Sequence, residues 1–118
     1  MDLQVISMKF LIEDNAKIDI KLAINWLAKK IPTDQAKAKI ISIINDVKNQ
    51  LIVHPNSGTQ CQFDFGDKYR EIIKGDYRTI YKLDKSAKTI TIILFCHTRM
   101  NFQVLLSQSN IYNQSNSV

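Results

Sequence analysis

Three side chains in the second half of the chain carry groups that can act on a phosphate: Arg78, His97 and Arg99. His97 and Arg99 are two residues apart, so a strand through both would project them to one side, with Arg78 on the neighbouring strand. Two guanidinium groups stabilise a phosphodiester or its dianionic transition state, and an imidazole with a near-neutral pKa moves a proton between the attacking hydroxyl and the leaving oxygen. The three residues are candidate catalytic residues for ribonuclease-type chemistry.

The same residues also fit a structural role. Strand arginines commonly pair with carboxylates at the rim of a sheet, and His97 would then be a hydrogen-bonded edge histidine. The carboxylates available for this pairing are Asp67, Glu71, Asp76 and Asp84. The spacing alone leaves both interpretations open.

The charge balance suits an anionic partner. The chain has 16 Lys+Arg against 11 Asp+Glu, a net charge of +5, which fits nucleic acid or an acidic polypeptide. Candidate nucleic-acid or target-binding residues on the predicted strands are Arg70, Lys74 and Lys82. Lysines such as Lys30 on the predicted helices are also typical of solvated helix faces, and Trp26 is typical of a core residue.

Neither a metal nor a cofactor is expected. The sequence has no Gly-rich phosphate loop, no nucleophile elbow and no CxxC or HExxH motif. Cys96 and His97 are adjacent in a predicted strand, so they would point to opposite faces and could not reach one ion. With only 2 cysteines, no basic leader and no apolar segment of membrane-spanning length, the chain is expected to be cytoplasmic, with no membrane partner.

The elements that must position these residues follow from the hydrophobic periods. A strand is expected at residues 9–12, then a helix from Asp14 as N-cap, broken by Pro32. Thr33 can cap a second helix that ends at residues 54–58, and the short link makes an antiparallel helical hairpin.

After Gly58 the period changes to two. Phe63 and Phe65 alternate, and strands at 69–74, 77–84 and 88–97 form an antiparallel meander. The last strand is expected to be central, with Ile90, Ile92, Leu94 and Cys96 on one face and Thr91, Ile93, Phe95 and His97 on the other. The predicted class is α+β: an N-terminal strand and a helical hairpin packed on one face of a C-terminal antiparallel sheet. One domain covers residues 8–102, and residues 103–118 form a polar, partly mobile tail.

Two segments carry a resemblance to a known family. The strand pair 69–81, with Tyr69-Arg70-Glu71 and Tyr77-Arg78, is followed by an apolar strand and His97-Thr98-Arg99. The hairpin closes in a Leu51-x-x-x-Pro55-x-x-Gly58 segment. These motifs resemble the RelE/ParE superfamily of toxins from type II toxin-antitoxin modules, over about residues 8–102.

The resemblance implies a growth-arresting toxin that a cognate antitoxin neutralises, in a complex that binds operator DNA through the antitoxin. RelE-like members act with the ribosome as mRNA endonucleases (mRNA interferases), and ParE-like members inhibit DNA gyrase. Arg78 matches the strand arginine of both branches, and Arg99 lies where the ribonucleases have a C-terminal arginine. No Tyr follows Arg99 closely, and Phe102 has no proton to transfer. The pattern is closer to the ParE-like, plasmid-stabilisation branch, which predicts gyrase inhibition. An mRNA endonuclease, with Arg78, His97 and Arg99 as catalytic residues, and an inactive antitoxin-binding relative are the alternatives.

Overall fold

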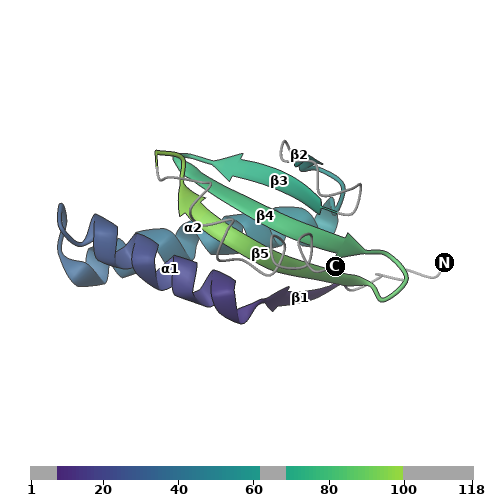
Figure 1. Ribbon diagram of the computed structural model, residues 1–118, viewed down its shortest axis with the longest axis horizontal. Helices are drawn as coiled ribbons and strands as arrows, with labels where there is room; N and C mark the ends of the chain where they lie inside the picture. The colour runs from purple at the N-terminus through teal and green to yellow at the C-terminus, as the bar shows by residue number, and fades with distance from the viewer. Residues whose placement is uncertain (1–7, 62–68, 100–118) are drawn as a thin grey trace, which may run out of the picture.

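Figure 1 shows the fold of the chain as a computed structural model, which describes residues 8–61 and 69–99. A short strand is followed by two helices and four further strands. Their bounds are β1 (Lys9–Ile12), α1 (Asp14–Leu27), α2 (Thr33–Val53), β2 (Thr59–Gln60), β3 (Tyr69–Lys74), β4 (Tyr77–Asp84) and β5 (Thr89–His97). The predicted alternation of Phe63 and Phe65 and the predicted tail at 103–118 lie outside the described residues.

The five strands form one sheet in the order β1-β5-β4-β3-β2. β3, β4 and β5 pair antiparallel, which confirms the predicted meander. β1 pairs parallel with β5, from Lys9 beside Thr89 to Ile12 beside Ile92, so the sheet as a whole is mixed. β5 therefore lies between two neighbours, and its residues from Ile92 to His97 are all buried, as expected of a central strand.

The two helices run along one face of this sheet and bury one stripe each (Figure 1). On α2 the buried residues recur at steps of four, seven and four, as a helix with one apolar face requires. One core cluster joins Ala16, Val47 and Leu51 to the sheet residues Ile72, Tyr81, Ile90 and Ile92. A second joins Ala23, Leu27, Ala36 and Ile40 to Tyr77 and Phe95. Two further large apolar residues of α1 are largely uncovered: Ile18 is 55% exposed and Leu22 44% exposed.

Each helix begins at the residue that was predicted as its N-cap, so both predicted N-caps are wrong by one position. The N-cap of α1 is Glu13 and that of α2 is Pro32, and neither side chain bonds to the helix N-terminus. The carbonyl of Pro32 already accepts a hydrogen bond from the N–H of Ala36, at 2.9 Å. The backbone carbonyl of Pro32 thus accepts the first hydrogen bond of the helix, and the fixed φ of proline favours this position just before the helix.

A bulge in β5 changes which of its residues face the helices. Ile80 pairs with Leu94 and Tyr81 with Ile92, so Ile93 has no partner on β4. The predicted alternation through the whole strand is therefore wrong: Ile90 and Ile92 share the helix-side face with Phe95 and His97. An extra residue inverts the alternation beyond it, and nothing in the local apolar pattern reveals where it is inserted.

Candidate functional site

Aromatic and basic side chains gather where β5 ends, against the end of α1. The imidazole of His97 packs on the indole of Trp26, with ring centroids 4.7 Å apart, and edge-on against Tyr77 at 5.1 Å. Lys30 follows Trp26 by four residues, and its Nζ lies 4.3 Å from the indole centroid, within cation–π range. We call Trp26, Lys30, Tyr77, His97 and Arg99 the basic–aromatic end.

His97 is held as a neutral imidazole. Its side chain is buried, and its Nδ1 accepts a hydrogen bond from the backbone N–H of Arg99 at 3.0 Å, so this nitrogen carries no proton. Burial lowers the pKa of His97; Asp76 opposes this, and the positive charges of Arg99, Lys30 and Lys39 lower it further. The other ring nitrogen, Nε2, therefore carries the proton and can donate a hydrogen bond, and the neutral ring adds no positive charge to the site.

Arg99 reaches this end through a turn. β5 ends at His97, and the N–H of Thr98 donates to the carbonyl of Asp76 at 2.7 Å, which ties the turn to the β3–β4 connection. The strand that would have carried His97 and Arg99 to one side therefore stops one residue after Cys96. Arg99 is exposed beside His97, which makes it available for contact with a partner.

Arg78 lies on the opposite face of the sheet from His97. His97 is the cross-strand partner of Tyr77, whereas Arg78 is opposite Cys96. Consecutive strand residues point to opposite faces. The Nε of Arg78 lies 3.0 Å from Oε2 of Glu71, and the two side chains are 16% and 8% exposed. Arg78, His97 and Arg99 therefore do not converge on one site, and the pairing of Arg78 matches the structural alternative raised by the sequence.

Arg70 fixes the segment that follows α2. Its Nη1 donates to the carbonyl of Gly58 at 2.8 Å. The hydroxyl of Tyr81, which lies opposite Arg70, donates to the carbonyl of Pro55 at 2.9 Å and accepts from the N–H of Gly58 at 3.0 Å. A Cβ at Gly58 would lie 2.5 Å from that hydroxyl oxygen, so only glycine fits. We call Pro55, Gly58, Arg70 and Tyr81 the tyrosine lock; it explains why the Pro-x-x-Gly spacing accompanies this pair of strands.

The remaining predicted target-binding residues lie apart. Lys74 is opposite Tyr77, on the helix-side face at the β3–β4 turn. Lys82 is opposite Tyr69 and Thr91, on the other face of β4. Arg70, Lys74 and Lys82 are thus spread over two faces of the sheet.

The sequence analysis missed three residues that shape this region: Trp26 and Lys30, assigned to core and solvent, and Asp19. Oδ2 of Asp19 accepts a hydrogen bond from the N–H of Phe95 at 3.2 Å, on the side of β5 that β1 leaves uncovered. The pKa of Asp19 is raised to about 6, because the effect of burial outweighs the opposite effect of this hydrogen bond. Two signals were available: the four-residue step from Trp26 to Lys30, and the place of Asp19 between buried Ala16 and Ala23.

Residues 8–61 and 69–99 offer no cluster of three or more His, Cys, Asp or Glu suited to a metal ion. Within the same ranges no helix combines the length and apolar character needed to cross a membrane. Cys96 is buried, and burial raises the pKa of its thiol to about 11, which keeps it protonated. That state fits a core residue.

Comparison with known proteins identifies relatives of the chain. The family model described as the ParE toxin of the type II toxin-antitoxin system, parDE, matches residues 10–102. No curated protein sequence matches at a significant level. The fold is similar to a solved chromosomal ParDE system from P. aeruginosa, with a TM-score of 0.63, 14% identity, and coverage of 78% of this chain and 97% of that chain. It is also similar to the toxin-antitoxin complex RelBE2 from Mycobacterium tuberculosis, with a TM-score of 0.58, 16% identity, and coverage of 77% and 98%. At these identities the likeness establishes the fold.

Proposed function

The chain belongs to the ParE toxin family of type II toxin-antitoxin systems, and we propose that it arrests growth by inhibiting DNA gyrase. The observation that carries this choice over mRNA cleavage is the position of Arg78, which pairs with Glu71 on the face of the sheet opposite His97. The guanidinium and the imidazole that cleavage would require are thus separated by the sheet.

Cleavage of a phosphodiester requires both groups within about 3 Å of the same reacting atoms. Arg78 would have to leave Glu71 to reach a phosphate beside His97. Removing one partner of a buried ion pair costs about 3–5 kcal/mol, because the other charge stays buried without compensation. The arrangement therefore favours a toxin that acts by binding its target.

The basic–aromatic end is the surface we assign to gyrase contact. It presents the ammonium of Lys30 and the guanidinium of Arg99 beside the half-buried indole of Trp26. Trp and Arg are enriched among the residues that dominate protein interfaces, and gyrase works on DNA, whose negative charge attracts cations. This end combines an apolar anchor with charge of the required sign.

An antitoxin is the second partner. The solved structures with a similar fold are toxin-antitoxin systems, which supports a small protein that binds and neutralises this chain. A net charge of +5 suits an acidic antitoxin segment. In this proposal the complex binds operator DNA through the antitoxin, and both proteins act in the cytoplasm, where gyrase is found.

A ribosome-dependent mRNA endonuclease is the second candidate, and one observation favours it. His97 is a neutral imidazole next to the exposed side chain of Arg99 and near Lys30. In this state Nε2 carries the proton and would donate it to the leaving oxygen, and the two cations would hold a phosphate. In this alternative Arg78 stabilises the sheet and takes no part in chemistry.

The two functions separate in paired assays with the purified chain at one concentration. The first measures supercoiling of relaxed plasmid by gyrase, and the second measures cell-free translation with primer extension on the mRNA. Gyrase inhibition predicts loss of supercoiling with intact mRNA. Cleavage of mRNA on ribosomes with normal supercoiling would overturn that proposal and support the endonuclease, and no effect in either assay would indicate an inactive antitoxin-binding relative.

A further inference from the structure

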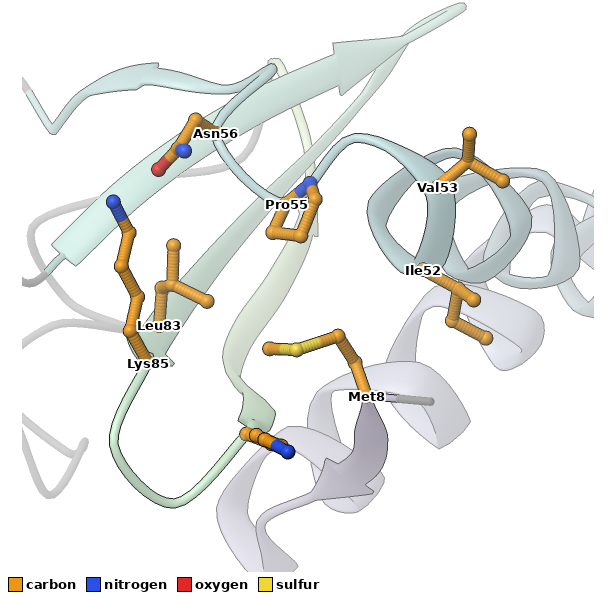
Figure 2. Close-up of a pocket in the computed structure, with 8 residues that line it drawn as sticks. Met8, Ile52, Val53, Pro55, Asn56, Leu83 and Lys85 are labelled. Atoms are coloured by element: carbon orange, nitrogen blue, oxygen red, sulfur yellow. The ribbon is translucent and has the colours of Figure 1, made fainter. Parts of the chain in front are cut away.

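A cavity of about 340 Å³ opens at the opposite end of the molecule from His97, where α2 ends. One wall is the end of α2 with the loop after it, and the other is the turn between β4 and β5. Figure 2 shows Met8 projecting between these walls, toward Leu83 and Pro55. We call this cavity the lysine-rimmed pocket, because Lys85 and Lys88 stand at its edge.

The inner surface of this pocket is apolar and part of it is open to solvent. Met8, Ile52 and Leu83 are each half-buried there, and Val53 is 67% exposed, the highest value among the large apolar residues of the described ranges. The volume of the lysine-rimmed pocket lies at the low end of the roughly 300–1,000 Å³ typical of binding cavities. That size suits one large apolar side chain with its neighbouring backbone.

The rim carries positive charge. Lys85 and Lys88 are exposed, and no carboxylate within residues 8–61 and 69–99 forms an ion pair with either ammonium group. Lys48 adds a third cation, with its Nζ 5.8 Å from the centre of the Phe10 ring, two residues along the chain from Met8. Figure 2 shows the side chain of Lys85 extending toward Asn56 at one side of the pocket. The groove around Ile41 on α2 differs, because Asp34 and Asp46 accompany Lys37 there.

Hydrogen bonds hold both walls in place. The carbonyl of Pro55 accepts from the hydroxyl of Tyr81 at 2.9 Å, so the tyrosine lock fixes the first wall. In the second wall, Oδ1 of Asp84 accepts from the N–H of Ala87 at 3.0 Å. The carbonyl of Lys88 accepts from the N–H of Lys9 at 2.8 Å, which joins that wall to β1. A pocket that is already formed loses little entropy when a ligand enters.

We infer that the lysine-rimmed pocket receives one large apolar side chain of an acidic peptide segment whose carboxylates lie against Lys85 and Lys88. Apolar burial provides the affinity, and the lysines select carboxylates on either side of the anchor. That the segment belongs to the antitoxin rests on the proposed function, whereas the chemistry of the pocket does not.

The test is an NMR titration of the 15N-labelled full chain with three capped tetrapeptides. The probe contains one leucine among glutamates; the controls replace its leucine by alanine or its glutamates by lysines. The first peptide is expected to shift the amide signals of Val53, Leu83 and Lys85 and to bind at least about tenfold more tightly than either control, a difference of about 1.4 kcal/mol. Equal binding of the three peptides, or shifts confined to another surface, would overturn the inference.

Variants sharpen the result without disturbing the core. Lys85→Glu with Lys88→Glu, or Val53→Asp alone, is expected to weaken binding of the probe at least about fivefold, because these exposed side chains set the charge and the apolar rim. Lys17→Glu with Lys21→Glu makes the same charge change on the exposed face of α1 and is expected to change binding less than about twofold. Equal losses of binding in the two charge variants would show unspecific attraction and would overturn the inference. Binding that appears only after residues 1–7 are deleted would show that the chain's own N-terminus occupies the pocket, which would also overturn it. Gyrase inhibition is measured separately, so failure of the proposed function leaves this titration interpretable.

Discussion

Two arginines of this chain carry the same charged group in opposite settings. Arg78 is half-buried on the face of the sheet away from the helices, and its Nε lies 3.0 Å from a carboxylate oxygen of the buried Glu71. Arg99 is exposed, beside a neutral His97 and the cation–π pair of Lys30 and Trp26. The first setting ties two strands together, whereas the second leaves a cation available to a partner. Burial and partner, rather than residue type, decide which arginine is a candidate for function.

The largest expected effect comes from breaking the buried pair. Glu71→Ala leaves Arg78 buried without its carboxylate and is expected to lower the free energy of unfolding by about 3–5 kcal/mol. Arg99→Ala removes an exposed group and is expected to change it by less than about 0.5 kcal/mol. Urea unfolding followed by circular dichroism measures both values.

A double variant serves as the control for that comparison. Glu71→Leu with Arg78→Met replaces the pair by apolar side chains of similar length, which often restores the stability that a single change removes. Recovery of most of the loss is expected. A Glu71→Ala chain as stable as the unaltered protein would show that this ion pair does not stabilise the fold, and the contrast between the two settings would fail.

The tyrosine lock should give the next largest effect. Tyr81→Phe removes the hydroxyl that bonds to Pro55 and Gly58 and leaves a buried N–H without a partner, so a loss of about 2 kcal/mol is expected in the same unfolding experiment. Tyr77→Phe is the matched control, because the Tyr77 hydroxyl makes no hydrogen bond to the described part of the chain; its loss should stay below about 0.5 kcal/mol. Similar losses for both variants would remove the lock from the account.

A smaller effect, dependent on pH, is expected at Asp19. Its folded-state pKa of about 6 lies above the ordinary value of 3.8, so the unfolded chain ionises first as the pH rises. Asp19 therefore lowers stability progressively between about pH 4 and pH 6, and the loss stays constant above that range. Asp19→Asn stays neutral and still accepts the hydrogen bond from Phe95.

The variant and the unaltered chain should be equally stable near pH 4. At pH 7 the variant should be more stable, by on the order of 1 kcal/mol once the partial exposure of the carboxylate is allowed for. Thermal unfolding of both chains in buffers from pH 4 to pH 8 measures this difference. A constant difference across the range would mean that Asp19 ionises as it does in the unfolded chain.

The sequence predicted the elements well because their signals are local. The strands at 69–74 and 77–84 flank Gly75, which adopts a positive φ of 57° in the turn between them, and the helices follow apolar steps of three and four. The parallel pairing of β1 with β5 depends on residues distant in the chain, and no local period encodes it.

The site was harder to predict because one inserted residue decides it. The bulge at Ile93 turns His97 toward Trp26, and the end of β5 places Arg99 in a turn. The sequence suggested His97 and Arg99 as candidates and offered Glu71 among the carboxylates available to the strand arginines. It could not show that Arg78 faces away from His97, since that requires the register between β4 and β5 and the burial of the pair.

The central claim is that the exposed cations of the basic–aromatic end act on gyrase. The most direct test uses a supercoiling assay with purified gyrase and compares two double variants. The first is Lys30→Glu with Arg99→Glu; the second, Lys17→Glu with Lys21→Glu, reverses as many charges on the exposed face of α1. The account predicts that the first pair raises the concentration needed for half-inhibition at least about tenfold, and the second less than about threefold, because only the first removes interface cations. Equal inhibition by both variants, at the level of the unaltered chain, would contradict it.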